Sequence, residues 1–325
     1  MYDKMEDVIE MCLEENANEI KGSKRKVSTC HDVIKVQKLD ETIVASKSKD
    51  DGQSEQEPSG FKNNHLNALV SKSPKKRLEI SNTKNVAYKD ANKKFIYGNY
   101  TNYYGYRNNA TFDRRLAVFQ NDSHLFTNKT VLDIGCNSGF ITTKVAELFN
   151  VKSIVGLDID RSLINKAIKN IVKKKNYAGT KQNAVKRQDF PFNVHFLHGN
   201  YVLRDDILLE IEKQQFDVIL CLSVTKWIQL NFGDAGLKQA FRRMFLQLHS
   251  GGKLILEAQT FKNYAKRQSL SEEIASNYKS IKFFPKQFTD YLLSEEVGFN
   301  YMELMGVPDD CTAGFKRPIQ IFTKL

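Results

Sequence analysis

The residues best suited to chemistry stand in one short stretch, VLDIGCNSGF at 131–140. A β-rich run ends near Asp133, Gly135 permits a tight turn, and a second glycine opens a helical stretch. This pattern predicts a nucleoside-binding turn, although an ordinary strand–turn–helix would look similar. Because Asn137 lies between the two glycines as G-x-N-x-G, the spacing differs from the G-x-G-x-x-G of dinucleotide sites. The turn therefore favours a cofactor without a pyrophosphate, such as S-adenosylmethionine.

Polar residues also follow the next two predicted strands, where ligands of an open α/β sheet bind. Asp158 stands close to the ~20-residue spacing expected for an acid that accepts ribose hydroxyls. Alternatively, Asp158 or Asp160 caps the helix that follows. Asn200 and Tyr201 follow the third strand and could hold an adenine, so three strand ends offer groups for one nucleoside.

Two further stretches predict the substrate side of the site. The fourth strand leads into SVTKWIQLNFGD at 223–234, where Lys226 and Asn231 suit a substrate clamp; a solvated loop with a buried tryptophan is the alternative. Upstream, FIYGNYTNYYGYR at 95–107 packs aromatic residues around Tyr103 and ends at Arg107. Such a segment either stacks on a ligand or plugs the core as a lid.

No nucleophile–base pair stands out, since His195, His198 and His249 fall in predicted strands or helices. That pattern suits methyl transfer to an oxygen that is already ionised, because the second pKa of a phosphate is about 6. Catalysis would then come from in-line positioning and the exclusion of water. Lys226 and Arg107 are the predicted phosphate-holding cations.

Alternating strands and helices must position these residues. The sequence predicts strands at 131–134, 153–158, 194–198, 216–222, 253–257, 301–306 and 319–323, and helices at 138–149, 161–174, 205–213, 235–248, 271–278 and 285–293. The alternation predicts a parallel sheet with right-handed crossovers, and the last two strands should form an antiparallel hairpin. The predicted fold is thus α/β, a Rossmann-like class I S-adenosylmethionine-dependent methyltransferase with a seven-stranded, mostly parallel sheet and one antiparallel strand.

Composition divides the chain near residue 90. Residues 1–90 are poor in aromatic residues and lack sustained periodicity, so we expect a disordered polar arm, followed by a methyltransferase domain at 91–325. The arm holds as many acidic as basic residues, so the formal net charge of +11 belongs to the domain. This excess favours a polyanionic partner, nucleic acid before acidic membrane, over a merely solvated basic surface. The basic segment 173–192 is either a disordered loop or an additional contact for a nucleic-acid backbone.

The remaining composition bears on location. Five cysteines at wide spacings, without a C-x-x-C pair, indicate neither a disulfide framework nor a metal site and favour a reducing compartment. No apolar run suits a signal peptide or a membrane span, so we expect neither. The clusters KRK at 24–26 and KKR at 75–77 could act as nuclear-import signals. We therefore expect a nuclear protein, and a monomer.

Seven motifs, in order along the chain, resemble one known family. They are GNYTNYYGYR at 98–107, DIGCNSG at 133–139, GLDID at 156–160, GNYVL at 199–203, LCLSVTKWIQLNFGDAGL at 220–237, LEAQTF at 256–261 and GFKRPI at 314–319. Together they resemble the RNA 5′-methylphosphate capping enzymes, the bicoid-interacting-protein-3 family, over roughly 95–325. The NYYGYR and TKW motifs resemble the triphosphate-capping branch more than the branch that methylates 5′-monophosphate RNA.

The resemblance implies transfer of a methyl group from S-adenosylmethionine to the 5′ γ-phosphate of a small nuclear RNA of the 7SK type, with a La-related protein as a partner. By motif, it implies cofactor contacts from Tyr104, Arg115, Gly135, Cys136, Asn137, Asp158, Ile159, Asn200, Tyr201 and Leu222. It implies phosphate and 5′-nucleotide contacts from Tyr103, Arg107, Lys226 and Asn231. Two alternatives stay open: an RNA-bound scaffold with slight or dispensable catalysis, and a methyltransferase for 5′-monophosphate RNA, small molecules or proteins.

Overall fold

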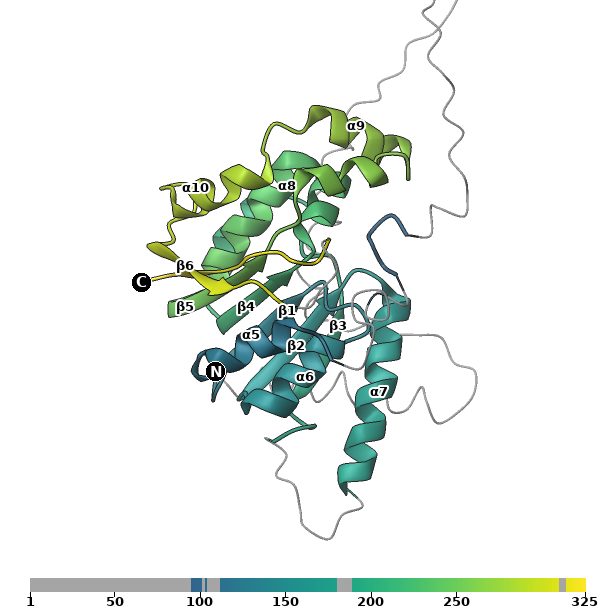
Figure 1. The fold of residues 1–325 in the computed structure, drawn as a ribbon, viewed down its shortest axis with the longest axis vertical. Coiled ribbons are helices and arrows are strands. Elements are labelled where there is room, and N and C mark those ends of the chain that lie inside the picture. The colour runs from purple at the N-terminus through teal and green to yellow at the C-terminus, as the bar shows by residue number, and fades with distance from the viewer. Residues whose placement is uncertain (1–94, 101–102, 104–111, 180–188, 310–313) are drawn as a thin grey trace, which may run out of the picture. The chain divides into compact units, whose positions relative to one another are not determined.

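A computed structural model gives the fold of residues 95–100, 103, 112–179, 189–309 and 314–325 (Figure 1). The predicted polar arm at 1–90 lies outside the described residues, as do the predicted site residues Tyr104 and Arg107. The basic segment predicted at 173–192 is described except for 180–188.

Seven strands form one sheet in the order β3-β2-β1-β4-β5-β7-β6 (Figure 1). The strands are β1 (Thr130–Ile134), β2 (Ser153–Asp158), β3 (Val194–His198), β4 (Phe216–Leu222), β5 (Leu248–Glu257), β6 (Tyr301–Gly306) and β7 (Ile319–Thr323). The first five strands pair in parallel, whereas β7 is antiparallel to both β5 and β6. The predicted sheet with one reversed strand is confirmed. β5 begins earlier than predicted because Leu248 already pairs with Phe216, ahead of an irregularity in the ladder.

Helices cover both faces of this sheet (Figure 1). On one face lie α5 (Arg115–Asn121), α6 (Phe140–Phe149) and α7 (Arg161–Gly179). On the other lie α8 (Thr225–Gln247) and α10 (Phe288–Leu293), with α9 (Glu272–Ser280) packed on α8. The segment predicted as a helix at 205–213 is a 3-10 helix, Asp206–Ile211, and α7 continues five residues past its predicted end at 174.

The largest difference from prediction is the start of α8. The helix predicted from 235 is confirmed as the part of α8 that follows Gly233, but an additional helical segment that was not predicted begins at Thr225, directly after β4. Gly233, with φ 67° and ψ −171°, is not helical, so α8 consists of two helical segments that meet at a kink. A glycine often stops a helix, but here it produces a kink and the helical pattern resumes. Lys226 and Trp227 therefore stand in the first turn of a helix at the edge of the sheet.

The core holds β1 and β4 side by side at the centre of the sheet. Successive residues of β4 point to opposite faces: Val218 and Leu220 pack in the cluster that includes α6 and α7, and Ile219 and Cys221 in the cluster that includes α8. Ile134 at the end of β1 pairs with Cys221 near the end of β4. The residues that follow these two strands are therefore brought to the same edge.

Candidate functional site

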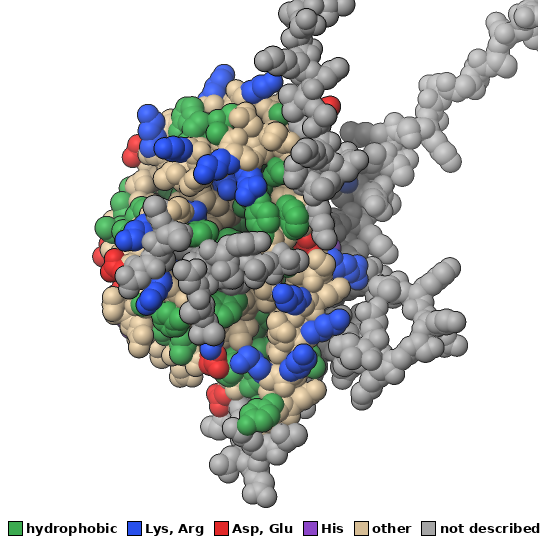
Figure 2. Space-filling model, turned by 45° about the vertical axis from the view of Figure 1, so that its right-hand side comes forward, with side chains coloured by type: hydrophobic (Ala, Val, Ile, Leu, Met, Phe, Trp, Pro, Cys, Tyr) green, Lys and Arg blue, Asp and Glu red, His purple; other side chains and the backbone are tan. Residues whose placement is uncertain are grey.

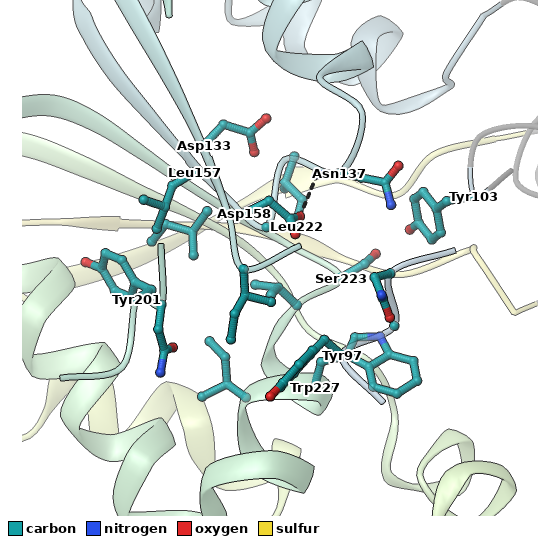
Figure 3. A pocket seen from close by; sticks show the side chains of 18 of the residues that line it. Tyr97, Tyr103, Asp133, Asn137, Leu157, Asp158, Tyr201, Leu222, Ser223 and Trp227 are labelled. Atoms are coloured by element: carbon teal, nitrogen blue, oxygen red, sulfur yellow. Dashed lines mark hydrogen bonds between the residues drawn. The ribbon is translucent and has the colours of Figure 1, made fainter. Parts of the chain in front are cut away.

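A pocket opens at the carboxyl ends of β1, β2, β3 and β4 (Figure 3). Nine of the residues predicted for the site line it: Tyr103, Arg115, Gly135, Asn137, Asp158, Ile159, Asn200, Tyr201 and Leu222. Trp227 and Tyr97 lie on the side of the pocket away from Asp133 (Figure 3). The sheet order thus gathers groups from segments far apart in the chain around one cavity.

The turn after β1 forms the floor of this pocket. The N–H groups of Gly135 and Cys136 both donate to the Leu157 carbonyl, at 2.8 and 3.0 Å, which ties the turn to β2. Gly135 has φ 72°, a left-handed conformation that side chains disfavour. A Cβ atom at Gly135 would lie 2.7 Å from Cγ2 of Val224, so the backbone here passes close to the start of α8.

Replacing Gly135 with alanine is expected to lower the free energy of unfolding by about 1–3 kcal/mol and to weaken nucleoside binding, because the added methyl meets Val224 in a strained backbone. Gly251→Ala is the matched control, since Gly251 has φ 76° but a methyl group added there would have no atom within 4 Å. Urea unfolding and calorimetric titration with S-adenosylhomocysteine measure the two effects. Equal stability losses and unchanged affinity in both variants would contradict the assigned contact.

Asp158 faces the pocket as a buried carboxylate, 8% exposed. Its Oδ2 accepts the Asn137 N–H at 2.8 Å (Figure 3) and its Oδ1 accepts the Asp160 N–H at 2.9 Å. Burial raises the pKa of Asp158, and these two backbone donors oppose that rise. A carboxylate has about four lone-pair sites, so two remain for ligand hydroxyls. The capping alternative belongs to Asp160, whose Oδ1 accepts the N–H groups of Ser162 and Leu163.

A buried charge network, consisting of Asp113, Arg115, Ser223, Glu257 and Arg317, lies beside the pocket. Arg115 donates to both oxygens of Asp113, at 3.0 and 2.8 Å, and to Glu257 at 3.0 Å. The Ser223 hydroxyl donates to Glu257 at 2.9 Å, and Arg317 donates to Ser223 at 2.9 Å. These contacts use three of the five N–H groups of Arg115. The two remaining N–H groups of Arg115 can donate to an anionic group bound in the pocket, which Arg115 lines.

Reasoning from the sequence singled out Arg115 by motif but missed Asp113, Glu257 and Arg317. Glu257 carries the one usable signal, because a carboxylate ends the apolar run KLILE of a central strand. A buried charge at such a position needs a cationic partner. The partners themselves could not be found by spacing, since Arg115 is 142 residues away from Glu257 in the chain.

A cationic cluster, defined as Lys226, Arg267 and Arg317, lies next to the pocket-lining Ser223 and Trp227. The Lys226 Nζ lies 4.4 Å from the Trp227 ring centroid. Burial, followed by the charges of Arg267 and Arg317, lowers the pKa of Lys226 to about 7. In the described part of the chain, no carboxylate pairs with Lys226. Because Arg317 also contacts Glu257 and Ser223, Lys226 and Arg267 supply the positive charge that an added anion would neutralise.

Three other predicted residues take different positions. Asn231 lies outside the pocket, where its amide donates to the carbonyls of Ile96 and Trp227, both at 2.9 Å. It thereby fastens the segment 95–100 to α8. The Cys136 side chain is buried in the core, so only its backbone belongs to the turn. Tyr103 lines the pocket and packs edge-on against Phe315, with ring centroids 6.3 Å apart.

The described residues provide neither a metal site nor a membrane-spanning helix. No group of three or more His, Cys, Asp or Glu side chains among them is arranged to hold a metal ion. Within the same residues, no helix has the length and apolar character needed to cross a membrane.

Comparison with known proteins adds sequence relatives to this geometry. A methyltransferase-domain family matches residues 132–254, and the bicoid-interacting protein 3 family matches residues 216–324. The U6 snRNA methylphosphate capping enzyme Amus of Drosophila melanogaster is 59% identical over 254 residues, which cover 78% of this chain and 81% of that protein. The 7SK snRNA methylphosphate capping enzyme of Homo sapiens is 38% identical over 280 residues, covering 73% of this chain and 40% of that protein.

A relative named for another substrate is less similar. The pre-miRNA 5′-monophosphate methyltransferase of Danio rerio is 28% identical over 222 residues, covering 57% of this chain and 76% of that protein. The order of similarity agrees with the motif-based prediction. With its methyltransferase fold, its pocket at the strand ends and these relatives, the chain belongs to the bicoid-interacting protein 3 family of methyltransferases.

Proposed function

We propose that this protein is an S-adenosylmethionine-dependent RNA methyltransferase that methylates the 5′ γ-phosphate of a small nuclear RNA. The observation that carries the proposal is the position of Lys226, whose Nζ lies 4.4 Å from the ring centroid of the pocket-lining Trp227, because a cation there would hold a phosphate next to a nucleoside cofactor. The relative with 59% identity is named for U6 RNA and the one with 38% for 7SK RNA. We therefore propose a U6-type RNA ahead of a 7SK-type RNA.

The donors in the pocket fit S-adenosylmethionine. Asp158 would accept the ribose hydroxyls, and the two remaining N–H groups of Arg115 would meet the methionine carboxylate. Ile134, Leu157 and Leu222 give the pocket apolar walls for a nucleobase. When bound, this cofactor supplies a methyl group on a positively charged sulfur. Tyr104, also expected at the cofactor by motif, lies outside the described residues.

The chain's own task is to hold and shield the phosphate. Lys226, Arg267 and Arg317 would neutralise and orient the phosphate oxygens, while Trp227 and Tyr103 exclude water from the reacting side. No general base is required, because a terminal phosphate is doubly ionised above a pKa of about 6. The catalytic contribution of the protein is therefore electrostatic and positional.

The pKa of Lys226 predicts a narrow pH optimum. We expect kcat/KM to rise as the terminal phosphate loses its last proton near a pH of about 6. It should fall above a pH of about 7, because Lys226, with a pKa of about 7, loses its charge as the pH rises. Lys226→Arg should remove the alkaline limb, since arginine stays protonated throughout. Initial rates across this pH range, with the exposed Lys266→Arg as control, test the assignment; an unchanged alkaline limb in Lys226→Arg would refute it.

The proposed reaction is tested by varying only the 5′ end of the RNA. Matched RNAs with a 5′-triphosphate, a 5′-monophosphate or a 5′-hydroxyl are incubated with cofactor labelled in its methyl group. We expect strong labelling of the triphosphate RNA, weaker labelling of the monophosphate RNA and none of the hydroxyl RNA. Equal labelling of all three would exclude a phosphate acceptor.

The other proposals rest on the resemblance and on composition. We propose a nuclear location, an RNA partner, a La-related protein in the same particle, and a division into an arm at 1–90 and a domain at 91–325. The scaffold alternative predicts that capped RNA stays bound after turnover, which a chase with unlabelled RNA measures.

A further inference from the structure

The outward face of α7 is unusually basic. Of the 19 residues in this helix, six are lysine or arginine and none is acidic. Leu163, Ile164, Ala167 and Ile171 are buried against the rest of the domain. Lys and Arg side chains outnumber Asp and Glu over the lower half of the face in Figure 2. The helix therefore presents a cationic surface on the side that does not pack.

Two lysines near the end of the helix contact the neighbouring fold. The Lys174 Nζ lies 3.7 Å from Glu147, and the Lys175 Nζ donates to the Val194 carbonyl at 3.2 Å. Three further lysines of α7, Lys166, Lys169 and Lys173, are exposed. Their spacing of i, i+3 and i+7 places them on one face of the helix. We call these three lysines, with the exposed Asn170 and Tyr177 among and beyond them, the α7 stripe.

The helix that carries the α7 stripe starts near the pocket. Arg161 begins the helix two residues after Ile159, which lines the pocket, and α7 then runs along the flank of the sheet. The contact of Lys175 with Val194, the first residue of β3, shows that the helix reaches the opposite edge. From Arg161 to Tyr177 the helix rises about 24 Å at 1.5 Å per residue. The stripe, which begins at Lys166, thus lies along a path that leads from the pocket to a region well beyond the reach of a single nucleotide.

The chemistry of the stripe selects among polyanions. A helix that lies on an acidic membrane turns an apolar face outward, whereas the apolar residues of α7 are buried. Lysine, asparagine and tyrosine side chains are the usual donors to phosphate and sugar oxygens. Tyr177 is 67% exposed and offers a ring on which a base can stack. These properties fit an RNA backbone.

We infer that the α7 stripe binds the body of the RNA whose 5′ end enters the pocket. This inference rests on the proposed function and extends it from the 5′ phosphate to the length of the substrate. From Lys166 to Tyr177 the stripe rises about 16 Å, which at roughly 3.4 Å per nucleotide step corresponds to about five steps. A short RNA ends before the far lysines, whereas a stem-loop of about 20 nucleotides passes all of them.

The test compares two RNAs and two triple variants. The stripe variant is Lys166→Gln, Lys169→Gln and Lys173→Gln; the control variant is Lys279→Gln, Lys282→Gln and Lys286→Gln, three exposed lysines on and after α9. Methylation is measured with a 5′-triphosphate dinucleotide and with a 5′-triphosphate stem-loop of about 20 nucleotides. We expect the stripe variant to raise KM for the stem-loop at least tenfold, with kcat and all dinucleotide rates unchanged. The control variant should match the unaltered protein.

Binding of the stem-loop at several salt concentrations separates this inference from the proposed function. Each lost phosphate contact reduces the slope of log K against log salt by about 0.7–0.9, so the stripe variant should lose about two units. The salt dependence of binding should change in this way even if the protein methylates neither RNA. Absence of methylation would contradict the proposed function but not the role of the stripe. An unchanged slope, or equal loss of rate with both RNAs, would overturn the role of the stripe.

Discussion

Replacing Lys226 with alanine is expected to lower kcat/KM for methylation of a 5′-triphosphate RNA by about 100-fold or more, the usual effect of removing one well-placed electrostatic contact. Lys226 is the cation that burial and the neighbouring Arg267 and Arg317 hold in a high-energy charged state. A bound phosphate would offset that repulsion, so we expect Lys226 to interact more favourably with the substrate than either arginine does. Initial rates at a pH of about 6.5, near the expected optimum between the two pKa values, measure the loss.

The control for this variant is Lys266→Ala, an exposed lysine next to Arg267 in the chain. It should retain nearly full activity, because an exposed charge contributes little. Lys226→Ala should fold normally, since its removal also removes repulsion within the cationic cluster. Retention of the stem-loop RNA should change little, because the α7 stripe is untouched. Comparable activities of Lys226→Ala and Lys266→Ala would contradict a phosphate-binding role for Lys226.

Replacing Glu257 with alanine is expected to lower the free energy of unfolding by about 3–5 kcal/mol, because removing one partner strands buried charges. Glu257 is fully buried, accepts from Arg115 and Ser223, and lies 3.5 Å from Arg317. Both guanidinium groups would lose a carboxylate in the same step. Urea unfolding followed by circular dichroism measures the change.

Glu303→Ala is the matched control, since Glu303 is an exposed glutamate in strand β6. A surface substitution of this kind changes stability by no more than about 0.5 kcal/mol. Glu257→Gln keeps the size and some hydrogen bonds, so its loss should fall between the two. If Glu257→Ala lowered the free energy of unfolding no more than Glu303→Ala does, the buried charge network would not stabilise the fold.

Much of the fold could be predicted because its strands are short apolar runs bounded by turn residues. The first segment of α8, which begins at Thr225 and ends at Gly233, could not, because it is short and the polar residues that follow β4 are equally compatible with a loop. α5 gave only a weak signal: Oδ1 of Asp113 accepts the N–H of Arg115, the first helical residue, but the helix is seven residues long and its first turn has no acidic residue. Its existence depends on packing, with Leu116, Val118 and Phe119 buried in the core.

Some residues of the candidate site could likewise be predicted from the sequence, and others could not. Asp158 could be predicted as a pocket residue because it follows a strand at a spacing typical of nucleotide sites. Arg317 and Glu257 could not, since they meet only when β7 returns beside β5. Asn231 was predicted from its place in a motif, but although the next residue, Phe232, lines the pocket, the Asn231 amide is turned to the carbonyl of Ile96. Motif position identifies the neighbourhood of a site, whereas side-chain direction needs the fold.

The central claim is that the methyl acceptor is the terminal phosphate. The most direct measurement labels a U6-type 5′-triphosphate RNA with methyl-labelled S-adenosylmethionine and then cleaves the triphosphate with a pyrophosphatase. The account predicts that the label leaves the RNA with the released phosphate, as methyl phosphate or methyl pyrophosphate. Label that stays with the base or ribose of the RNA would contradict it.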